Sequence, residues 1–196
     1  MGIYKYIRNS WNDETPEMKA LWKSRLIQWR AEPVTMRISH PTRLDRARAL
    51  GYRAKDGVIV VRQRVNKGAH NREDRSGGRH SSNSQHSMNL GMNRQIIAER
   101  RANDSYHNCE VLSSYFVAKD GKHVWYEVIL VDRASPTVLA DVRLAGVAGQ
   151  RARAYRGLTS ASRKSRGLRH KGKGAEHKRG KRFGTAGKNN AKQMNG

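Results

Sequence analysis

The stretch that decides the fold is Val111-Leu-Ser-Ser-Tyr-Phe-Val117, followed beyond Asp120-Gly121 by Val124-Trp-Tyr-Glu-Val-Ile-Leu-Val131. Both runs are rich in β-branched and aromatic residues, which favour strands. The Asp-Gly pair between them is typical of a type I′ turn, so the two runs predict a β-hairpin. In the second run, alternate residues from Val124 to Leu130 form one face, and Glu127 lies on the other.

A further strand is predicted for Val58 to Val65. Ile59, Val61 and Val65 share one of its faces, whereas Arg62 and Arg64 share the other and would point outward. An outward pair of arginines suits a strand that lies against phosphate groups, and a solvated face is the plainer alternative.

Helix signals surround these strands. Thr15-Pro16 combines a capping hydroxyl with a proline at the first helical position. Thr42 is expected to cap a short helix that Gly51 ends. Asn93 is expected to cap a third helix, and Ser135-Pro136 to start a fourth. Helices are therefore predicted over residues 15–29, 42–50, 93–102 and 135–144. Strands and helices in this order predict a small α+β domain.

Charge divides the chain unevenly. The formal net charge is +24, and residues 151–196 hold 15 Lys/Arg against one acid, Glu176. This segment has little apolar surface to offset the cost of ordering, about 1–2 kcal/mol per residue, so its partner should be a large polyanion. We therefore expect an α+β core with N-terminal helices over residues 1–150, a basic loop inserted near 66–92, and an extended basic tail over 151–196.

Several classes of protein are disfavoured. Cys109 is the only cysteine, which excludes an internal disulfide and a cysteine-based zinc cluster, and the histidines lack partners at metal-ligand spacing. No apolar run is long enough for a membrane span or a signal peptide, so we expect an intracellular protein with no membrane partner. Glu127 and Asp132 are spaced to face opposite sides, a poor acid/base pair. Gly187-Lys188 lacks the earlier glycine of a phosphate-binding loop. We expect no enzymatic activity, cofactor, metal or small-molecule substrate.

The remaining chemistry is phosphate binding. Arginine binds phosphate with two parallel hydrogen bonds, and release of counterions from a polyanion gives salt-dependent affinity. The tail has only two aromatic residues, Tyr155 and Phe183, so stacking on single-stranded bases is disfavoured and contact with the backbone of folded RNA is favoured. A general nucleic-acid-binding or chromatin-type protein would share this composition.

Three motifs narrow the choice. They are Pro41-Thr-Arg-Leu-Asp-Arg-Ala-Arg-Ala-Leu-Gly-Tyr-Arg-Ala-Lys55 with Gly57-Val-Ile-Val-Val-Arg62, Val111–Tyr115 with Tyr126–Asp132, and Arg156-Gly-Leu-Thr-Ser-Ala-Ser-Arg-Lys-Ser-Arg-Gly-Leu168. In this order they resemble ribosomal protein fifteen of the large subunit, eukaryotic type, a family shared by archaea and eukaryotes. The stretch from Ala134 to Gln150 departs from the family's usual sequence.

This resemblance implies an α+β core related to a split β-α-β arrangement with a hairpin. It also implies a non-catalytic constituent of the large subunit of cytoplasmic ribosomes, in one copy per ribosome. Its partners would be large-subunit rRNA and neighbouring ribosomal proteins. The resemblance and the charge pattern together predict these RNA-binding residues: Arg43, Arg46, Arg48, Arg53, Lys55, Arg62, Arg64, Lys67, Arg72, Arg75, Arg79, Arg156, Arg163, Lys164, Arg166, Arg169, Lys171 and Lys173.

Overall fold

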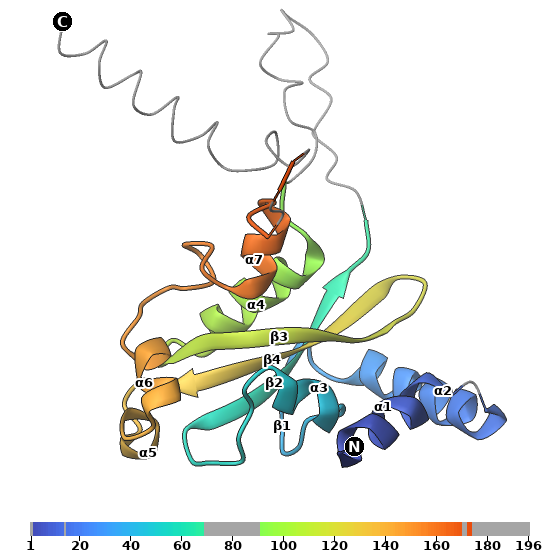
Figure 1. The fold of residues 1–196 in the computed structure, drawn as a ribbon. Helices are drawn as coiled ribbons and strands as arrows, with labels where there is room; N and C mark the ends of the chain where they lie inside the picture. Colours follow the sequence, from blue (N-terminus) through green and yellow to red (C-terminus); the bar gives the residue numbers. More distant parts are fainter. Residues whose placement is uncertain (1, 14, 69–90, 170–171, 174–196) are drawn as a thin grey trace, which may run out of the picture.

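The computed structural model describes residues 2–13, 15–68, 91–169 and 172–173, and it is a mixed α and β fold (Figure 1). In chain order the elements are α1 (Ile3–Asn12), α2 (Pro16–Ala31), β1 (Thr35–Ile38), α3 (Leu44–Ala49), β2 (Val58–Asn66), α4 (Arg94–Ser105), β3 (Cys109–Lys119), β4 (His123–Asp132), α5 (Pro136–Leu139), α6 (Val142–Ala148) and α7 (Ser160–Ser165). The predicted α+β class is confirmed.

The four strands form one sheet in the order β1-β2-β4-β3, in which every neighbouring pair is antiparallel. β2 and β3 both run antiparallel to β4, so they run parallel to each other with β4 between them. α4 lies between β2 and β3 in the chain, which gives the split β-α-β arrangement that the resemblance implied. The predicted hairpin is the β3–β4 pair.

The turn of this hairpin differs from the predicted type I′. A type I′ turn needs positive φ at both central residues, and the positive-φ residues of the described chain include neither Asp120 nor Gly121. The Asp120 carboxylate instead accepts the backbone N–H of Lys122 at 2.8 Å and that of His123. Such side-chain-to-backbone bonding is the turn chemistry of aspartate, and it moves the turn one residue along the chain.

The sheet is buried on both faces. Val60 and Val61 point to opposite faces, and both side chains are almost fully buried. One face is covered by residues of α2, α3, α5 and α6: Trp29, Ala47, Val138, Leu144 and Ala148. The other is covered by Ala98 and Ala102 of α4 and by Ala154. Figure 1 shows α4 and α7 on one side of the sheet, away from α1, α2 and α3.

Two predicted helix caps are confirmed. The Thr15 hydroxyl accepts the backbone N–H of Met18 at 3.3 Å, and the Asn93 side chain accepts that of Ile96 at 2.9 Å. Because each cap acts within one turn of its own helix, the local sequence suffices to predict it.

The other helix predictions need correction. Thr42 caps no helix: α3 begins at Leu44, and the Thr42 hydroxyl bonds the buried carboxylate of Glu127. The single helix predicted for 135–144 is two short ones, because Asp141 caps α6 by accepting the N–H of Arg143 at 3.0 Å. The sequence patterns also gave no indication of α1. In the described part of the chain, no helix is long and apolar enough to cross a membrane.

Candidate nucleic-acid interface

Arg62 of β2 lies inside the protein. Its guanidinium pairs with the Glu32 carboxylate at 2.8 Å and lies 4.4 Å from the centre of a Trp29 ring. Only 9 % of the residue is exposed. The prediction that Arg62 points outward is therefore wrong, because the end of α2 covers this face of the sheet.

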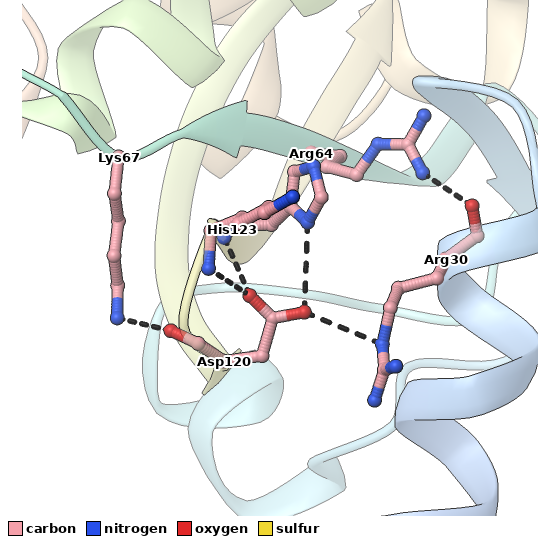
Figure 2. A network of polar contacts seen from close by, with 6 residues as sticks. Arg30, Arg64, Lys67, Asp120 and His123 are labelled. Carbon is pink, nitrogen blue, oxygen red and sulfur yellow. Dashed lines mark hydrogen bonds and ion pairs between the residues drawn. The ribbon is translucent and has the colours of Figure 1, made fainter.

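Arg64 and Lys67 also bind protein groups, as Figure 2 shows. Arg64 donates to the backbone carbonyl of Arg30 at 2.6 Å, and Lys67 donates to the backbone carbonyl of Asp120. The Asp120 carboxylate pairs with Arg30 at 3.4 Å and with His123 at 3.5 Å. Burial raises the pKa of Asp120, but the hydrogen bonds from His123 and Lys122 outweigh it and hold that pKa below its usual value. These contacts tie α2 to the hairpin.

The basic residues around α3 fall into two groups. Arg43 pairs with Asp45 at 3.2 Å, and Lys55 pairs with Asp141 at 2.7 Å. The second group comprises Arg46, Arg48 and Arg53, of which Arg46 and Arg53 are exposed and Arg48 is half-buried. This region therefore presents fewer available cations than its sequence predicts.

Residues 151–169 concentrate the exposed charge. They contain seven Lys/Arg and no acid. The exposed ones are Arg151, Arg156, Arg163, Lys164, Arg166 and Arg169, whereas Arg153 is half-buried. The segment also packs on the core, because Ala154, Thr159 and Ala161 are buried and α7 contacts α4 and β3. A run of cations is thus held on a folded surface.

Two glycines shape this basic segment. Gly167 has a φ of 71° and ends α7 with a Schellman motif, in which the Leu168 N–H reaches the Arg163 carbonyl at 3.0 Å. Gly157 has a φ of 72°, and its carbonyl accepts a bond from Arg166 at 2.6 Å. A Cβ atom on Gly157 would lie 3.0 Å from the guanidinium carbon of Arg166. The glycines of the Arg156–Leu168 motif therefore serve the backbone conformation.

Two buried carboxylates hold the basic segment on the core. The Glu110 side chain accepts the backbone N–H of Ala152 at 2.8 Å and of Arg153 at 3.1 Å. Glu99 accepts the Thr159 hydroxyl at 2.6 Å and the Ser114 hydroxyl. Burial raises the pKa of Glu99 despite these hydrogen bonds. No sequence motif singled out Glu99 or Glu110; the one available signal was that acids are scarce in this basic chain.

Gly68 and Gly91, which flank residues 69–90, are bonded to α4 and α7 respectively. Arg94 of α4 donates to the Gly68 carbonyl at 3.4 Å, and the Ser165 hydroxyl donates to the Gly91 carbonyl at 3.3 Å. Residues 68, 91 and 165 are thereby brought together. The site prediction did not include Arg94 and Arg101 of α4, which are exposed here.

Most of the remaining predicted site residues fall in segments that the structure does not describe. Arg72, Arg75, Arg79 and Lys171 lie outside the described residues, whereas Lys173 is described and exposed. Within the described ranges, no group of three or more His, Cys, Asp or Glu side chains is arranged to hold a metal ion. Cys109, at the start of β3, is buried.

The fold holds a run of exposed cations on one surface, in the segment that packs against α4. Such a basic patch on a folded domain is typical of nucleic-acid-binding proteins. Comparison with known proteins identifies the family. The family model described as Ribosomal L15 matches residues 2–184. The chain is 46% identical over 178 residues to large ribosomal subunit protein eL15 of Nanoarchaeum equitans, covering 90% of this chain and 94% of that one.

Two further relatives carry the same description. The chain is 47% identical to that of Methanocorpusculum labreanum, covering 89% of this chain and 91% of the relative. It is 45% identical to that of Thermoplasma volcanium, covering 91% and 92%. The chain therefore belongs to the eL15 family of ribosomal proteins, and the resemblance drawn from its motifs is confirmed.

Proposed function

We propose that this protein is a structural constituent of the large ribosomal subunit that binds rRNA through its phosphates and stabilises packed RNA helices. Membership of the eL15 family supports the assignment. The observation that carries the RNA-binding part is the segment 151–169, where six exposed cations lie on a folded surface and no acid occurs. Exposed guanidinium groups at fixed positions suit phosphates at fixed positions.

The proposed interface extends beyond this segment. Exposed Arg46, Arg53 and Lys173 belong to it, as do the predicted residues Arg72, Arg75, Arg79 and Lys171 and the added residues Arg94, Arg101 and Arg151. We leave Arg62 out because Glu32 and Trp29 occupy its guanidinium. In this proposal the chain up to residue 150 is the folded platform, and residues 151–196 are the main rRNA-binding part.

The proposal includes no catalytic role. Glu99, Glu110 and Glu127 are almost fully buried, and each accepts hydrogen bonds from protein groups that fix distant segments together. Carboxylates used in this way are not available as an acid/base pair for a substrate. Contacts with neighbouring large-subunit proteins, one copy per ribosome and a location on cytoplasmic ribosomes complete the proposal.

The test compares the affinity of the full chain for archaeal large-subunit rRNA with its affinity for duplex DNA at physiological salt. We expect much tighter binding to the rRNA, since specific recognition exceeds the charge-driven background. Equal affinity would instead support a general nucleic-acid-binding or chromatin-type protein. Sedimentation of a cell lysate gives an independent reading, because a protein found mainly away from large subunits would contradict the proposal.

A further inference from the structure

Glu110 contacts the start of the basic segment through backbone N–H groups, not through a cationic side chain. Its two carboxylate oxygens accept the successive backbone N–H groups of Ala152 and Arg153. Ala152 has a φ of 52°, the only positive φ of a non-glycine residue in the described chain. This conformation costs an L-residue about 1–2 kcal/mol, so the surrounding contacts must maintain it. Successive N–H groups in such a bend form a concave site for an anion, which the Glu110 carboxylate fills.

Glu99 makes the second attachment. It accepts the hydroxyl of Thr159, and the same Thr159 oxygen accepts the backbone N–H of Ser162 at 3.3 Å to cap α7. Glu99 is 1% exposed and Thr159 0%. The attachments at residues 152–153 and 159 therefore fix both the start of the basic segment and the start of α7.

Glu110 and Glu99 hold the basic segment without pairing with its exposed cations. Glu110 bonds backbone groups and Glu99 bonds hydroxyls, so neither forms an ion pair with the exposed cations of residues 151–169. Among the seven Lys/Arg of this segment, Arg153 is the one that is half-buried rather than exposed. It donates to the backbone carbonyl of Val111. The acids thus order the segment without neutralising its outer face.

We propose that Glu110 and Glu99 are positioning residues, which order residues 151–169 before RNA is bound so that the exposed cations meet the rRNA at preset spacings. This inference rests on the proposed rRNA-binding function. A segment ordered only on binding would lose affinity to its conformational entropy, which a preordered segment has already lost on folding. Apparent affinity scales with the fraction of molecules that hold the competent conformation.

The two acids offer a matched pair of isosteric substitutions, Glu110→Gln and Glu99→Gln. Backbone N–H groups can only donate, so an amide NH₂ at position 110 cannot replace an oxygen that accepts from Arg153. Hydroxyls both donate and accept, so the Thr159 oxygen can accept a bond from an amide NH₂ at position 99. Burial raises the pKa of Glu99, so Glu99→Gln removes at most one negative charge, as Glu110→Gln does, and a pure charge effect has the same sign for both variants.

The experiment measures binding of the full chain and both variants to archaeal large-subunit rRNA across a series of salt concentrations. We expect Glu110→Gln to weaken binding about tenfold, as when the competent conformation falls to about one molecule in ten. The salt slope should not change, because every cation is retained. Glu99→Gln should bind as the wild type does, or slightly tighter. A pure charge mechanism predicts the opposite sign for Glu110→Gln, since the variant is more positive.

Hydrogen exchange measured on the free protein provides a readout that does not involve RNA. Peptides covering residues 151–168 should exchange faster in Glu110→Gln than in the wild type, and peptides from β4 should exchange alike. If β4 also exchanges faster, Thr159→Val is the second variant, because it removes the other attachment and leaves Glu110 in place. That variant should show the same faster exchange of residues 151–168 and the same weaker binding.

The outcomes separate the two proposals. Wild-type protein that shows no preference for large-subunit rRNA would overturn the proposed function. Wild-type protein that binds the rRNA, together with a Glu110→Gln variant of equal affinity and equal exchange, would overturn the positioning role alone.

Discussion

The arginines of β2 and the basic residues of 151–169 look alike in sequence, but the fold uses them differently. Arg62 and Arg64 bind a carboxylate and a carbonyl of the same chain. Six cations of residues 151–169 are exposed, although Ala154, Thr159 and Ala161 of the same segment are buried. The difference is not the density of charge, since both regions are rich in Lys and Arg.

What differs is which atoms the neighbouring acids bind. Glu32 binds the guanidinium of Arg62, so the charge of that arginine is neutralised within the protein. Glu110 and Glu99 bind backbone N–H groups and hydroxyls, so the cations beside them are left available. A count of net charge cannot distinguish these cases, and four predictions test the distinction.

Arg62→Ala should have the largest effect, and the effect should be on stability. The substitution removes the partner of a Glu32 side chain that is 12% exposed and the cation above Trp29. Breaking a buried pair typically costs about 3–5 kcal/mol, measured here by urea denaturation. The salt slope of rRNA binding should not change under conditions in which the variant is folded.

Arg53→Ala is the control for this prediction. Arg53 is exposed, so its loss should change the free energy of unfolding by about 0.5 kcal/mol or less. A stable Arg62→Ala protein with a reduced salt slope would show that Arg62 contacts phosphate after all.

Replacing Arg151, Arg163, Lys164 and Arg169 together by glutamine should instead affect rRNA binding and leave stability unchanged. These side chains are exposed, so the core should melt as before. Binding to rRNA should weaken by roughly a hundredfold at low salt. The salt slope should fall by up to about 0.9 for each phosphate that the variant no longer neutralises.

The matched control changes the same amount of charge on other elements. Lys23, Arg37, Lys119 and Arg143 are exposed residues of α2, β1, β3 and α6. Their fourfold replacement by glutamine should weaken rRNA binding much less. An equal loss in the two variants would mean that only the total charge matters, which would contradict a localised interface.

Local signals supported much of the fold prediction. The hairpin, β2 and the caps at Thr15 and Asn93 depend on residues a few positions apart, and all four are confirmed. The failures involve partners that are distant in the chain. Thr42 carries the signal of a cap, but its hydroxyl bonds Glu127, 85 residues away.

The same limit applies to the candidate site. The sequence predicted a basic surface, and comparison confirmed the family, yet the burial of Arg62 depends on where α2 ends in space. The packing of residues 151–169 depends on small residues such as Ala154 and Ala161, which carry no strong apolar signal. Glu110 is recognisable as an anchor only once the Ala152 and Arg153 N–H groups are seen beside it.

Gly157→Ala should destabilise the folded conformation of the basic segment, by less than Arg62→Ala destabilises the whole protein. The backbone there has a φ of 72°, and a new Cβ would lie 3.0 Å from the Arg166 guanidinium. We expect a local cost of about 1–2 kcal/mol, seen as faster hydrogen exchange over residues 151–168. Gly146→Ala is the control with the opposite sign: Gly146 lies within α6 with no neighbour in the way, so alanine should stabilise by about 0.5–1 kcal/mol.

Asp120→Asn should have the smallest effect, and one that depends on pH. An asparagine side chain still has an oxygen for the N–H groups of Lys122 and His123, so the substitution isolates the charge that meets Arg30. Burial raises the pKa of Asp120, but the hydrogen bonds from His123 and Lys122 lower it by a larger amount. The pKa of Asp120 is therefore lower in the folded protein than in the unfolded chain. The ionised carboxylate therefore stabilises the fold above the unfolded pKa, about 3.9, and this stabilisation is lost as the pH falls through the folded pKa.

The difference in unfolding free energy between wild type and this variant, followed by urea denaturation, should shrink as the pH falls from about 5 through the folded-state pKa. A difference that grows over this acidic range would mean that the charge of Asp120 does not support the α2–hairpin contact. The contact between α2 and the hairpin would then depend on the bonds of Arg64 and Lys67 to backbone carbonyls, and the contrast with residues 151–169 would rest on Arg62 and Glu32.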